Sequence, residues 1–492
     1  MKNFTTVAVA YGDGIGPEIM DAVLYILKEA EAQIKIEIID IGEKLYNRNY
    51  TSGISQEAWD TIYNTKILLK SPITTPQGGG YKSLNVTLRK ALGLYANVRP
   101  SISYHPFVET KHPKMDLTII RENEEDIYAG IEYRHTGDTY ESIKLISARG
   151  SERIARYAFE YAKQNGRKKV SCFVKDNIMK FTDGIFHKKF KEVAAEYPEI
   201  QSNVYIVDIG MAKLAASPEE FDVIVTSNLY GDIASDVASL VSGSVGLSGS
   251  SNIGDNFAMF EAVHGSAPDI ADKGIANPSG LLNAAIMMLV YIGQSKIANL
   301  IENAWKKTIE DGIHTADIFN KNNSNQKVST SEFAKAVVER FGQKPSSLKE
   351  ANYKESALIK SFDIGLQKSD TKKLVGVDIF CNISQITPEL IKKIQSISTN
   401  DSNNALELKT IASKGLKIWS FDNPGNINRN VLSDHMCLRF QSKSQNGTIS
   451  PISHGEVGKF IVEFASLNIG FIKIENLYEF DGVRGFSLSQ GE

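Results

Sequence analysis

The chain has 492 residues, of which 42% are hydrophobic and 23% charged, and its formal net charge is −3. This length exceeds what one hydrophobic core usually serves, so we expect two or three domains. The near-neutral charge argues against a surface for nucleic acid or for anionic lipids, because both need clustered lysine and arginine. Cys172, Cys381 and Cys437 are too few and too scattered for a disulfide framework or a thiolate zinc site.

We expect no targeting segment at the beginning of the chain. A strand-like run follows almost at once, and no apolar stretch there ends in a cleavage site of small residues. The most apolar helical stretch, at residues 284–293, is shorter than the roughly 20 residues that span a membrane. We therefore expect a soluble cytoplasmic protein in a reducing compartment, with no membrane partner and no nucleic-acid partner.

Up to about residue 340, strand-like segments alternate with helical ones. This rhythm predicts an α/β fold with much parallel sheet. Residues 130–148 differ, because they read as two strands around a polar turn, an arrangement that often contacts a second subunit. The expected elements are strands at 5–11, 35–40, 168–174 and 220–228, and helices at 17–32 and 182–196.

The composition changes at residues 343–373, which are polar and rich in lysine and serine. This composition predicts a linker with one short helix. A second unit follows, and its order of strand, helix, three strands, helix and strand predicts a small α+β sheet with helices on one face. Its expected segments are 374–383, 388–397, 406–411, 416–421, 436–441, 455–467 and 471–480.

Gly12, Gly14 and Gly16 lie between the first strand and the first helix. A dinucleotide fingerprint has the spacing GxGxxG, whereas these glycines give GxGxG, and Pro17 suits an ordinary first helical turn. The favoured interpretation is a tight turn that needs glycine.

Several polar and cationic residues occur at predicted helix and strand ends: Ser83, Asn85, Arg89, Arg99 and Arg121. Taken singly, arginines are most often surface charges or members of structural ion pairs. Together they suit a substrate with several carboxylates, because guanidinium groups bind carboxylates through two parallel hydrogen bonds.

Asp232 and Asp236 lie four residues apart in the segment NLYGDIASD, hence on one face of a helix. Like charges at this spacing repel unless a cation lies between them. Oxygen ligands without histidine or cysteine favour Mg²⁺ or Mn²⁺, and Asp208 could supply a third carboxylate. The alternative is a pair of solvated acids on a helix surface.

Two further segments carry candidate residues. Lys175 directly follows a strand, where it is either an ordinary exposed lysine or a proton shuttle whose pKa a nearby metal would lower. The segment EAVHGSAPDIADKGIANP contains His264, which could be structural or catalytic, and Asp269. A carboxylate in such a loop can accept hydrogen bonds from a ribose diol and repel a 2′-phosphate.

In this order and spacing, the segments SLNVTLRK, YANVRP, RENEEDIYAG, KDNIMK, NLYGDIASD and EAVHGSAPDIA closely resemble the β-decarboxylating dehydrogenases, which act on isocitrate, homoisocitrate or 3-isopropylmalate. The resemblance implies the isocitrate/isopropylmalate dehydrogenase-like α/β fold, which is not of the Rossmann type. The implied parts are a catalytic region at 1–342, with a large domain at 1–98 and 245–342 and a small domain with a dimer clasp at 99–244, then a linker at 343–373 and a C-terminal α+β domain at 374–492.

The resemblance also implies roles for individual residues. Ser83, Asn85, Arg89, Arg99 and Arg121 would bind the substrate. Tyr128 and Lys175, the latter with Asp208, would transfer protons, and Asp208, Asp232 and Asp236 would hold Mg²⁺ or Mn²⁺. Thr75, His264, Gly265, Ala267, Asp269, Ile270 and Asn277 would bind the coenzyme. A homodimer is implied, in which Lys175 and Asp208 reach the active site of the partner subunit.

The expected reaction is oxidative decarboxylation of isocitrate to 2-oxoglutarate and CO₂, a step of the tricarboxylic acid cycle. Homoisocitrate, 3-isopropylmalate or tartrate as substrate, and a regulatory subunit of the same fold, are the alternatives. NADP-dependent bacterial members have a Lys–Tyr pair, a Tyr and an Arg where this chain has Asp269, Ile270, Ala316 and Asn320, so we predict a preference for NAD. Asp272 stands where relatives usually have glycine.

Overall fold

The computed structural model describes residues 4–48, 50, 53–75, 82–355, 359, 362, 364–365, 370–400, 405–421, 433–445 and 448–491. The chain forms two compact units. The N-terminal unit comprises Met1–Ala129 and Lys144–Ile364, and the C-terminal unit comprises Gly130–Ile143 and Gly365–Glu492. The division of residues 1–342 into a large and a small domain stays a prediction.

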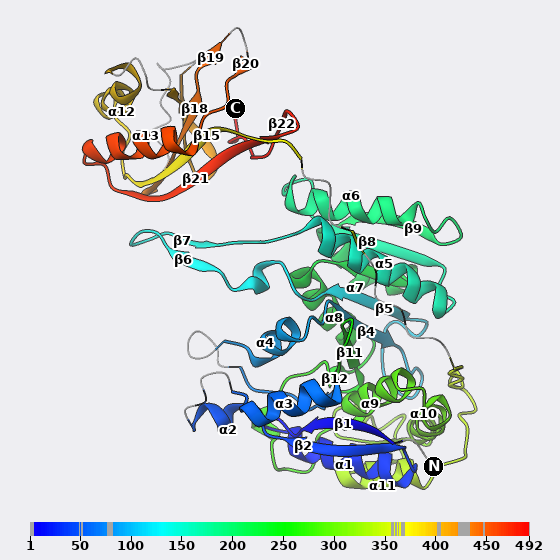
Figure 1. Cartoon of the computed structure of the whole chain (residues 1–492). Coiled ribbons are helices and arrows are strands. Elements are labelled where there is room, and N and C mark those ends of the chain that lie inside the picture. The colour runs from blue at the N-terminus through cyan, green and yellow to red at the C-terminus, as the bar shows by residue number, and fades with distance from the viewer. Residues whose placement is uncertain are drawn as a thin grey trace. The chain divides into compact units, whose positions relative to one another are not determined.

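A ten-stranded sheet forms the centre of the N-terminal unit, in the order β2-β1-β3-β12-β11-β4-β5-β10-β8-β9 (Figure 1). The outer strands pair in parallel, whereas β11 and β4 run antiparallel to their neighbours in the middle. The predicted α/β fold is confirmed. The strands are β1 Thr5–Ala10, β2 Ile34–Ile39, β3 Ile67–Lys70, β4 Ala96–Ile102, β5 Asp116–Glu122, β8 Lys169–Val174, β9 Gln201–Ile206, β10 Val223–Thr226, β11 Gly249–Ile253 and β12 Ala258–Ala262.

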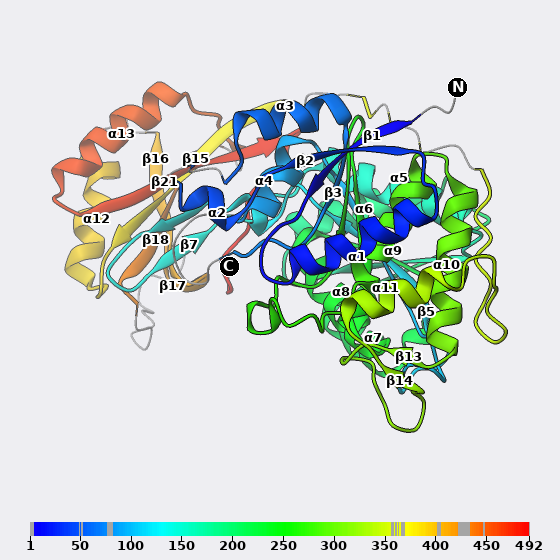
Figure 2. The same cartoon turned by 90° about the horizontal axis from the view of Figure 1, so that it is seen from below.

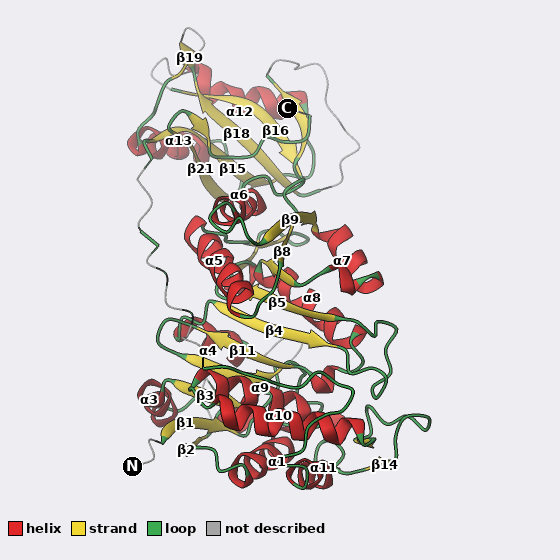
Figure 3. Cartoon of the chain, turned by 90° about the vertical axis from the view of Figure 1, so that its right-hand side faces the viewer, coloured by secondary structure: helices red, strands yellow, loops and turns green. Residues whose placement is uncertain are grey.

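Helices cover both faces of this sheet (Figure 3). Figure 2 shows the same unit from below, with α1 and α9 close together. The helices are α1 Gly16–Glu29, α2 Glu43–Tyr46, α3 Gln56–Thr65, α4 Leu84–Ala91, α5 Ala148–Gln164, α6 Thr182–Ala194, α7 Val207–Ala216, α8 Asn228–Val241, α9 Ser279–Tyr291, α10 Ser295–Glu310 and α11 Thr330–Val338. A short pair, β13 Ile313–His314 and β14 Gln326–Lys327, completes the unit.

The two faces of the sheet are packed differently. On one face, a continuous core joins β1, β4, β5, β8 and β10 to helices α1, α5, α9, α10 and α11. On the other face, two separate apolar clusters occur, one under α3 and α4 and one under α7 and α8. Because side chains alternate along a strand, the middle strands turn Asn97, Arg99, Asn252 and Glu261 away from the continuous core, and all four are buried. The gap between the two clusters is therefore polar.

The segment predicted as a linker is fixed along α10 over part of its length. Asn303 and Asn299 each exchange two hydrogen bonds with its backbone, at Ala351 and Tyr353 respectively. Glu310 accepts three more from Ser346–Leu348. Within the residues described, no helix is long and apolar enough to cross a membrane.

The C-terminal unit contains a six-stranded antiparallel sheet in the order β17-β16-β18-β15-β21-β22. Helices α12 and α13 contact each other and cover a core of β-branched, leucine and phenylalanine side chains. The predicted C-terminal α+β domain is confirmed. The elements are β15 Lys372–Asn382, α12 Pro388–Asn400, β16 Leu406–Ser413, β17 Leu416–Ser420, β18 His435–Ser442, β19 Ser444–Gln445, β20 Thr448–Ile449, α13 His454–Ser466, β21 Phe471–Phe480 and β22 Val483–Arg484.

The predicted two-stranded segment forms the hairpin of β6 Glu132–Arg134 and β7 Tyr140–Ser142, and it belongs to the C-terminal unit. His135 Nδ1 lies 3.0 Å from His435 Nε2, and the two rings are stacked. Lys473 Nζ donates to Glu141 at 2.7 Å. These contacts join the hairpin to β18 and β21.

Candidate active site

A cavity of about 330 Å³ lies in the N-terminal unit, and two of the polar residues between the two apolar clusters, Arg99 and Glu261, line it. Its walls come from the ends of β3 and β12, from α4 and α8, and from the loop after β12. Ten of the predicted site residues line it: Thr75, Ser83, Asn85, Arg89, Arg99, Tyr128, Asp232, Asp236, His264 and Gly265.

Helix α4 supplies the first wall. Ser83 precedes its first turn without capping it, and the Ser83 hydroxyl accepts a hydrogen bond from Thr75 at 3.4 Å. Within the part of the chain that the structure describes, the buried Asn85 Oδ1 and Arg89 Nε have no hydrogen-bond partner. Buried polar atoms without partners are costly, so both atoms are suited to binding a polar ligand in the cavity.

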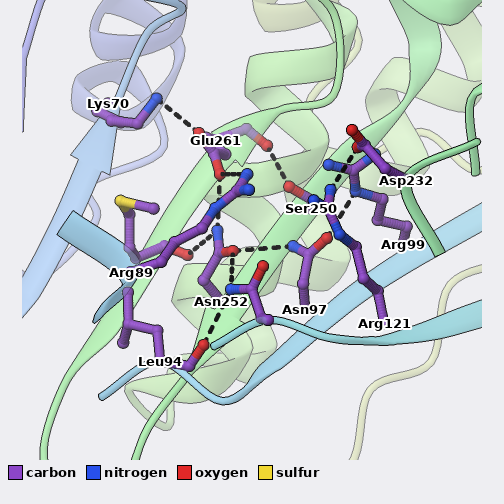
Figure 4. Close-up of polar contacts among 12 residues, drawn as sticks. Lys70, Arg89, Leu94, Asn97, Arg99, Arg121, Asp232, Ser250, Asn252 and Glu261 are labelled. Atoms are coloured by element: carbon purple, nitrogen blue, oxygen red, sulfur yellow. Dashed lines mark hydrogen bonds and ion pairs between the residues drawn. The ribbon is translucent and has the colours of Figure 1, made fainter. Parts of the chain in front are cut away.

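A buried ion group lies beneath this wall (Figure 4). Glu261 accepts contacts from Lys70 Nζ at 2.5 Å, Arg89 Nη2 at 3.0 Å and Asn252 Nδ2 at 2.8 Å. Burial by itself would raise the pKa of Glu261, but Lys70 and Arg89 hold that pKa well below its usual value. The guanidinium of Arg89 is therefore fixed by a carboxylate that stays ionised.

Two further arginines meet the aspartates of α8. Arg99 donates to Asn97 and Ser235 at 2.6 Å each, and its Nη1 lies 3.2 Å from Asp232 and 3.5 Å from Asp236. A guanidinium close to two carboxylates reduces the repulsion that their spacing causes.

Arg121, from β5, is almost fully buried. It donates to Asn228 at 2.7 and 2.9 Å and pairs with Asp232. Burial, together with the positive charges of Arg99 and Arg89, lowers the pKa of Arg121 to about 9. A ligand with negative charge would relieve this concentration of positive charge.

Tyr128 stands in a short 3₁₀ turn, Ile127–Ala129, beside these groups. Its hydroxyl donates to Asp232 Oδ2 at 2.5 Å, and the Arg121 guanidinium lies 4.9 Å from the centre of its ring. Burial raises the pKa of Tyr128 to about 12, although Arg121 acts in the opposite direction. Tyr128 is therefore a neutral hydrogen-bond donor over the physiological range.

The two aspartates of α8 have different environments. Burial favours a higher pKa at both, but Arg121 and Arg99 lower the pKa of Asp232, whereas the pKa of Asp236 is raised. Both carboxylates line the cavity, and their hard oxygen atoms fit Mg²⁺ or Mn²⁺. Among the residues that the structure describes, no third carboxylate, histidine or cysteine joins them to form a group of three.

Lys175 and Asp208 are not among the residues that line the cavity. Lys175 follows β8, and its Nζ lies 2.8 Å from Asp208 Oδ1 at the start of α7. This hydrogen bond lowers the pKa of Asp208 below its usual value. The structure thus brings these two predicted residues together, away from Asp232 and Asp236 of the same chain.

The loop after β12 carries the remaining predicted residues. His264 Nε2 is buried and lacks a partner among the described residues, and burial lowers the pKa of His264. Asp269 and Ile270 lie in a 3₁₀ turn that follows Ala267, and Asn277 donates to Asp317 at 3.1 Å.

The backbone of this loop is unusual at a residue that is not glycine. Asp272 has φ +59°, in the left-handed region that glycine adopts most readily.

Residues 6–337 match the family described as isocitrate/isopropylmalate dehydrogenase. The chain belongs to this family. Residues 372–492 match the C-terminal domain described for bacterial isocitrate dehydrogenase, so both parts of the isocitrate/isopropylmalate dehydrogenase-like chain have counterparts.

Relatives with known names agree with this membership. A Rickettsia felis protein named isocitrate dehydrogenase [NADP] is 61% identical over the whole of both chains. A Thermus thermophilus protein of the same name is 38% identical over 99% of this chain and 96% of its own. The crystal structure of the TT0538 protein from Thermus thermophilus has a TM-score of 0.90 and 37% identity, covering 99% of this chain and 96% of that one. The names of these relatives do not support the predicted NAD preference.

Lys70, Asn252 and Glu261 were not among the residues predicted for the site. Lys70 ends the strand β3, and Glu261 opens the segment EAVHGSAP. A charged residue within an otherwise apolar strand was the available signal, since such residues are rarely buried without a partner.

Proposed function

We propose that this chain oxidises and decarboxylates isocitrate to 2-oxoglutarate and CO₂ with a nicotinamide coenzyme and a divalent metal. The observation that carries the proposal is the set of arginines around a cavity whose buried Asn85 Oδ1 and Arg89 Nε lack partners among the described residues. The names of the full-length relatives support the same substrate.

The charges of the site suit a tricarboxylate. Among the described residues named above, four cationic side chains (Lys70, Arg89, Arg99, Arg121) face three carboxylates (Asp232, Asp236, Glu261), an excess of one positive charge. A bound divalent cation would raise this excess to three, which matches the three negative charges of isocitrate. Arg89, Arg99 and Arg121 would bind the carboxylates, with Ser83 and Asn85 at one end.

The metal would be held by Asp232 and Asp236 of this chain, with Asp208 as the third carboxylate. A divalent cation there would supply Lewis-acid polarisation of the substrate oxygen. Tyr128 stays protonated and would donate its hydroxyl proton to the enol left after loss of CO₂. The Lys175–Asp208 pair would take up the proton of the substrate hydroxyl as the hydride leaves for the coenzyme.

Because Lys175 and Asp208 lie away from the cavity of their own chain, we propose that they serve the site of a second copy in a homodimer. Helices α7 and α8 offer a surface for such pairing. Ile209 is 51% exposed, Ile233 49% and Leu240 68%, although all three are large apolar residues on helices. Exposed apolar residues gathered on neighbouring helices are typical of subunit interfaces.

For the coenzyme, two candidates remain. NADP is favoured by the names of the relatives that cover the whole chain. NAD is favoured by Asp269, whose carboxylate would repel a 2′-phosphate if it faced the adenosine ribose. We propose NADP as the coenzyme of this chain, since the naming holds at 61% identity over the full length.

A substrate and coenzyme panel tests these proposals. Isocitrate, homoisocitrate, 3-isopropylmalate and tartrate are each assayed with NADP or NAD and with Mg²⁺, Mn²⁺ or EDTA. We expect the highest kcat/KM for isocitrate with NADP. We expect no activity in the presence of EDTA. A higher kcat/KM for another acid would refute isocitrate as the substrate. A higher kcat/KM with NAD than with NADP would refute NADP as the coenzyme and favour the prediction from Asp269.

A further inference from the structure

Lys175 is the first residue of a loop that is held by hydrogen bonds between its own backbone groups. The loop runs from the end of β8 to the first turn of α6, and the carbonyl of Lys175 accepts hydrogen bonds from Ile178 and Met179 at 3.1 and 2.9 Å. The side chain of Lys175 is 28% exposed and meets Asp208. An exposed lysine on a loop has many accessible positions, so a catalytic role requires that its backbone be held.

Asp183 holds that backbone from α6. Its Oδ2 accepts the hydrogen bond of the Lys175 N–H at 2.5 Å, and the residue is only 2% exposed. A second contact supports the same loop, because His187 Nδ1, one turn further along α6, lies 2.6 Å from Asp176 Oδ2. Two neighbouring residues of the loop are thus attached to one helix.

The buried charge of Asp183 is balanced by Lys144. Lys144 Nζ lies 2.8 Å from Asp183 Oδ1 and 3.6 Å from Asp126 Oδ1, and Asp126 is fully buried. Asp126 in turn accepts hydrogen bonds from the Ser227 hydroxyl at 2.9 Å and the Leu229 N–H at 3.0 Å, at the start of α8. Buried carboxylates that share one cation are costly to separate. The start of α6 is therefore fixed to the start of α8.

We infer that Asp183 is the positioning residue for Lys175. This inference rests on the proposed role of Lys175 in proton transfer. Within the described part of the chain, Asp183 contacts no residue of the cavity wall, so it acts through the backbone of Lys175 and not through the substrate. Lys144 contacts the other oxygen of the same carboxylate, Oδ1, which leaves Oδ2 to the Lys175 N–H.

The chain provides a matched control at the other end of the same strand. Asp222 accepts a hydrogen bond from the Lys168 N–H at 2.5 Å and pairs with Arg167 at 3.0 Å, just before β8 begins. Asp183 and Asp222 therefore make the same kinds of contact, a backbone N–H and a cation. Only Asp183 is attached to the residue proposed to transfer the proton.

The first experiment compares Asp183→Ala with Asp222→Ala in the full chain, using kcat and KM for isocitrate and the thermal midpoint. We expect both variants to lose thermal stability. In Asp183→Ala, kcat should fall by about tenfold or more with KM changed by less than about threefold, because misplacing a reacting group costs rate and not substrate binding. Asp222→Ala should keep its kcat. Equal losses of kcat in the two variants, or an unchanged kcat in Asp183→Ala, would overturn the inference.

Asp183→Asn tests the hydrogen bond itself and serves if the alanine variant does not fold. The amide oxygen of asparagine can still accept the Lys175 N–H, so kcat should return to within about threefold of the original enzyme even though the pairing with Lys144 is lost. A rate as low as that of Asp183→Ala would contradict positioning through this hydrogen bond.

A mixing experiment separates this inference from the proposed shared site. Lys175→Met and Asp232→Asn chains should each be inactive alone and regain activity when mixed, because one site of the mixed dimer keeps both residues. Adding Asp183→Ala to the Asp232→Asn chain, which supplies Lys175, should lower the regained rate more than adding it to the other chain. No activity on mixing would refute the shared site, whereas equal loss in both arrangements would refute the positioning role.

Discussion

Replacement of Glu261 by glutamine tests the buried ion group beneath the cavity. Glu261 is 4% exposed and contacts Lys70, which is 1% exposed, and Arg89, which is 7% exposed. A glutamine keeps only one accepting oxygen and no charge, and its amide nitrogen, a donor, would face a cation. Removing one member of a buried charge group costs about 3–5 kcal/mol, because the remaining charges are left without compensation. We expect Glu261→Gln to lose about this much stability.

The measurement is the free energy of unfolding by urea, followed by the change in tryptophan fluorescence, to which Trp305 in the core of the N-terminal unit contributes. Glu37→Gln is the control, because Glu37 pairs with Lys35 at 3.3 Å on the surface and such exposed pairs contribute at most about 1 kcal/mol. Adding Lys70→Met to Glu261→Gln should restore part of the loss, since it removes one of the two unpaired cations. A loss below about 1 kcal/mol in Glu261→Gln would refute the reasoning.

Three other variants probe separate features. Tyr128→Phe should lower kcat for isocitrate by about 10²- to 10⁴-fold while KM changes little, because it removes a proton donor and leaves the arginines in place; steady-state kinetics checks this. In the C-terminal unit, burial and the neighbouring His135 lower the pKa of His435 from its ordinary value of 6.5. The unfolded chain therefore binds this proton more readily, so stability should be full above pH 6.5 and fall as the pH drops through the folded-state pKa. His435→Asn should flatten this dependence in thermal unfolding curves. Asp272→Gly should raise stability by about 1 kcal/mol in urea unfolding, because it relieves a left-handed backbone; no gain would count against strain at this position.

Much of the fold could be predicted from local pattern. The order of strands and helices in the C-terminal unit agrees with the sequence, because alternating apolar residues and turn signals are local properties. The tight glycine turn is also found, since Gly12 and Gly14 have φ +67° and +60°. The spacing of Asp232 and Asp236 was sufficient to place both on one face of α8.

Other features depend on contacts distant in sequence. The pairing of Lys70 with Glu261 joins residues 191 positions apart through the register of β3 and β12, which no local pattern contains. The polar segment at 346–354 was interpreted as linker because its own residues are hydrophilic. Its backbone partners, Asn299 and Asn303, lie on α10, and a helix pattern does not indicate what its polar side chains bind.

The position of the cavity follows from a change of direction in the sheet. Parallel strands buried on both faces carry continuous apolar runs, as in β1, β8 and β10. In the middle, the antiparallel strand β4 alternates polar and apolar residues, and Asn252 of the neighbouring β11 pairs with Asn97, so one face can keep Asn97, Arg99 and Asn252 without disturbing the core on the other. These polar residues bond one another, which satisfies them without water. Hydrogen bonds among these buried side chains hold the neighbouring charged groups in fixed positions. Arg99 and Glu261 therefore face the cavity from strands and not from loops.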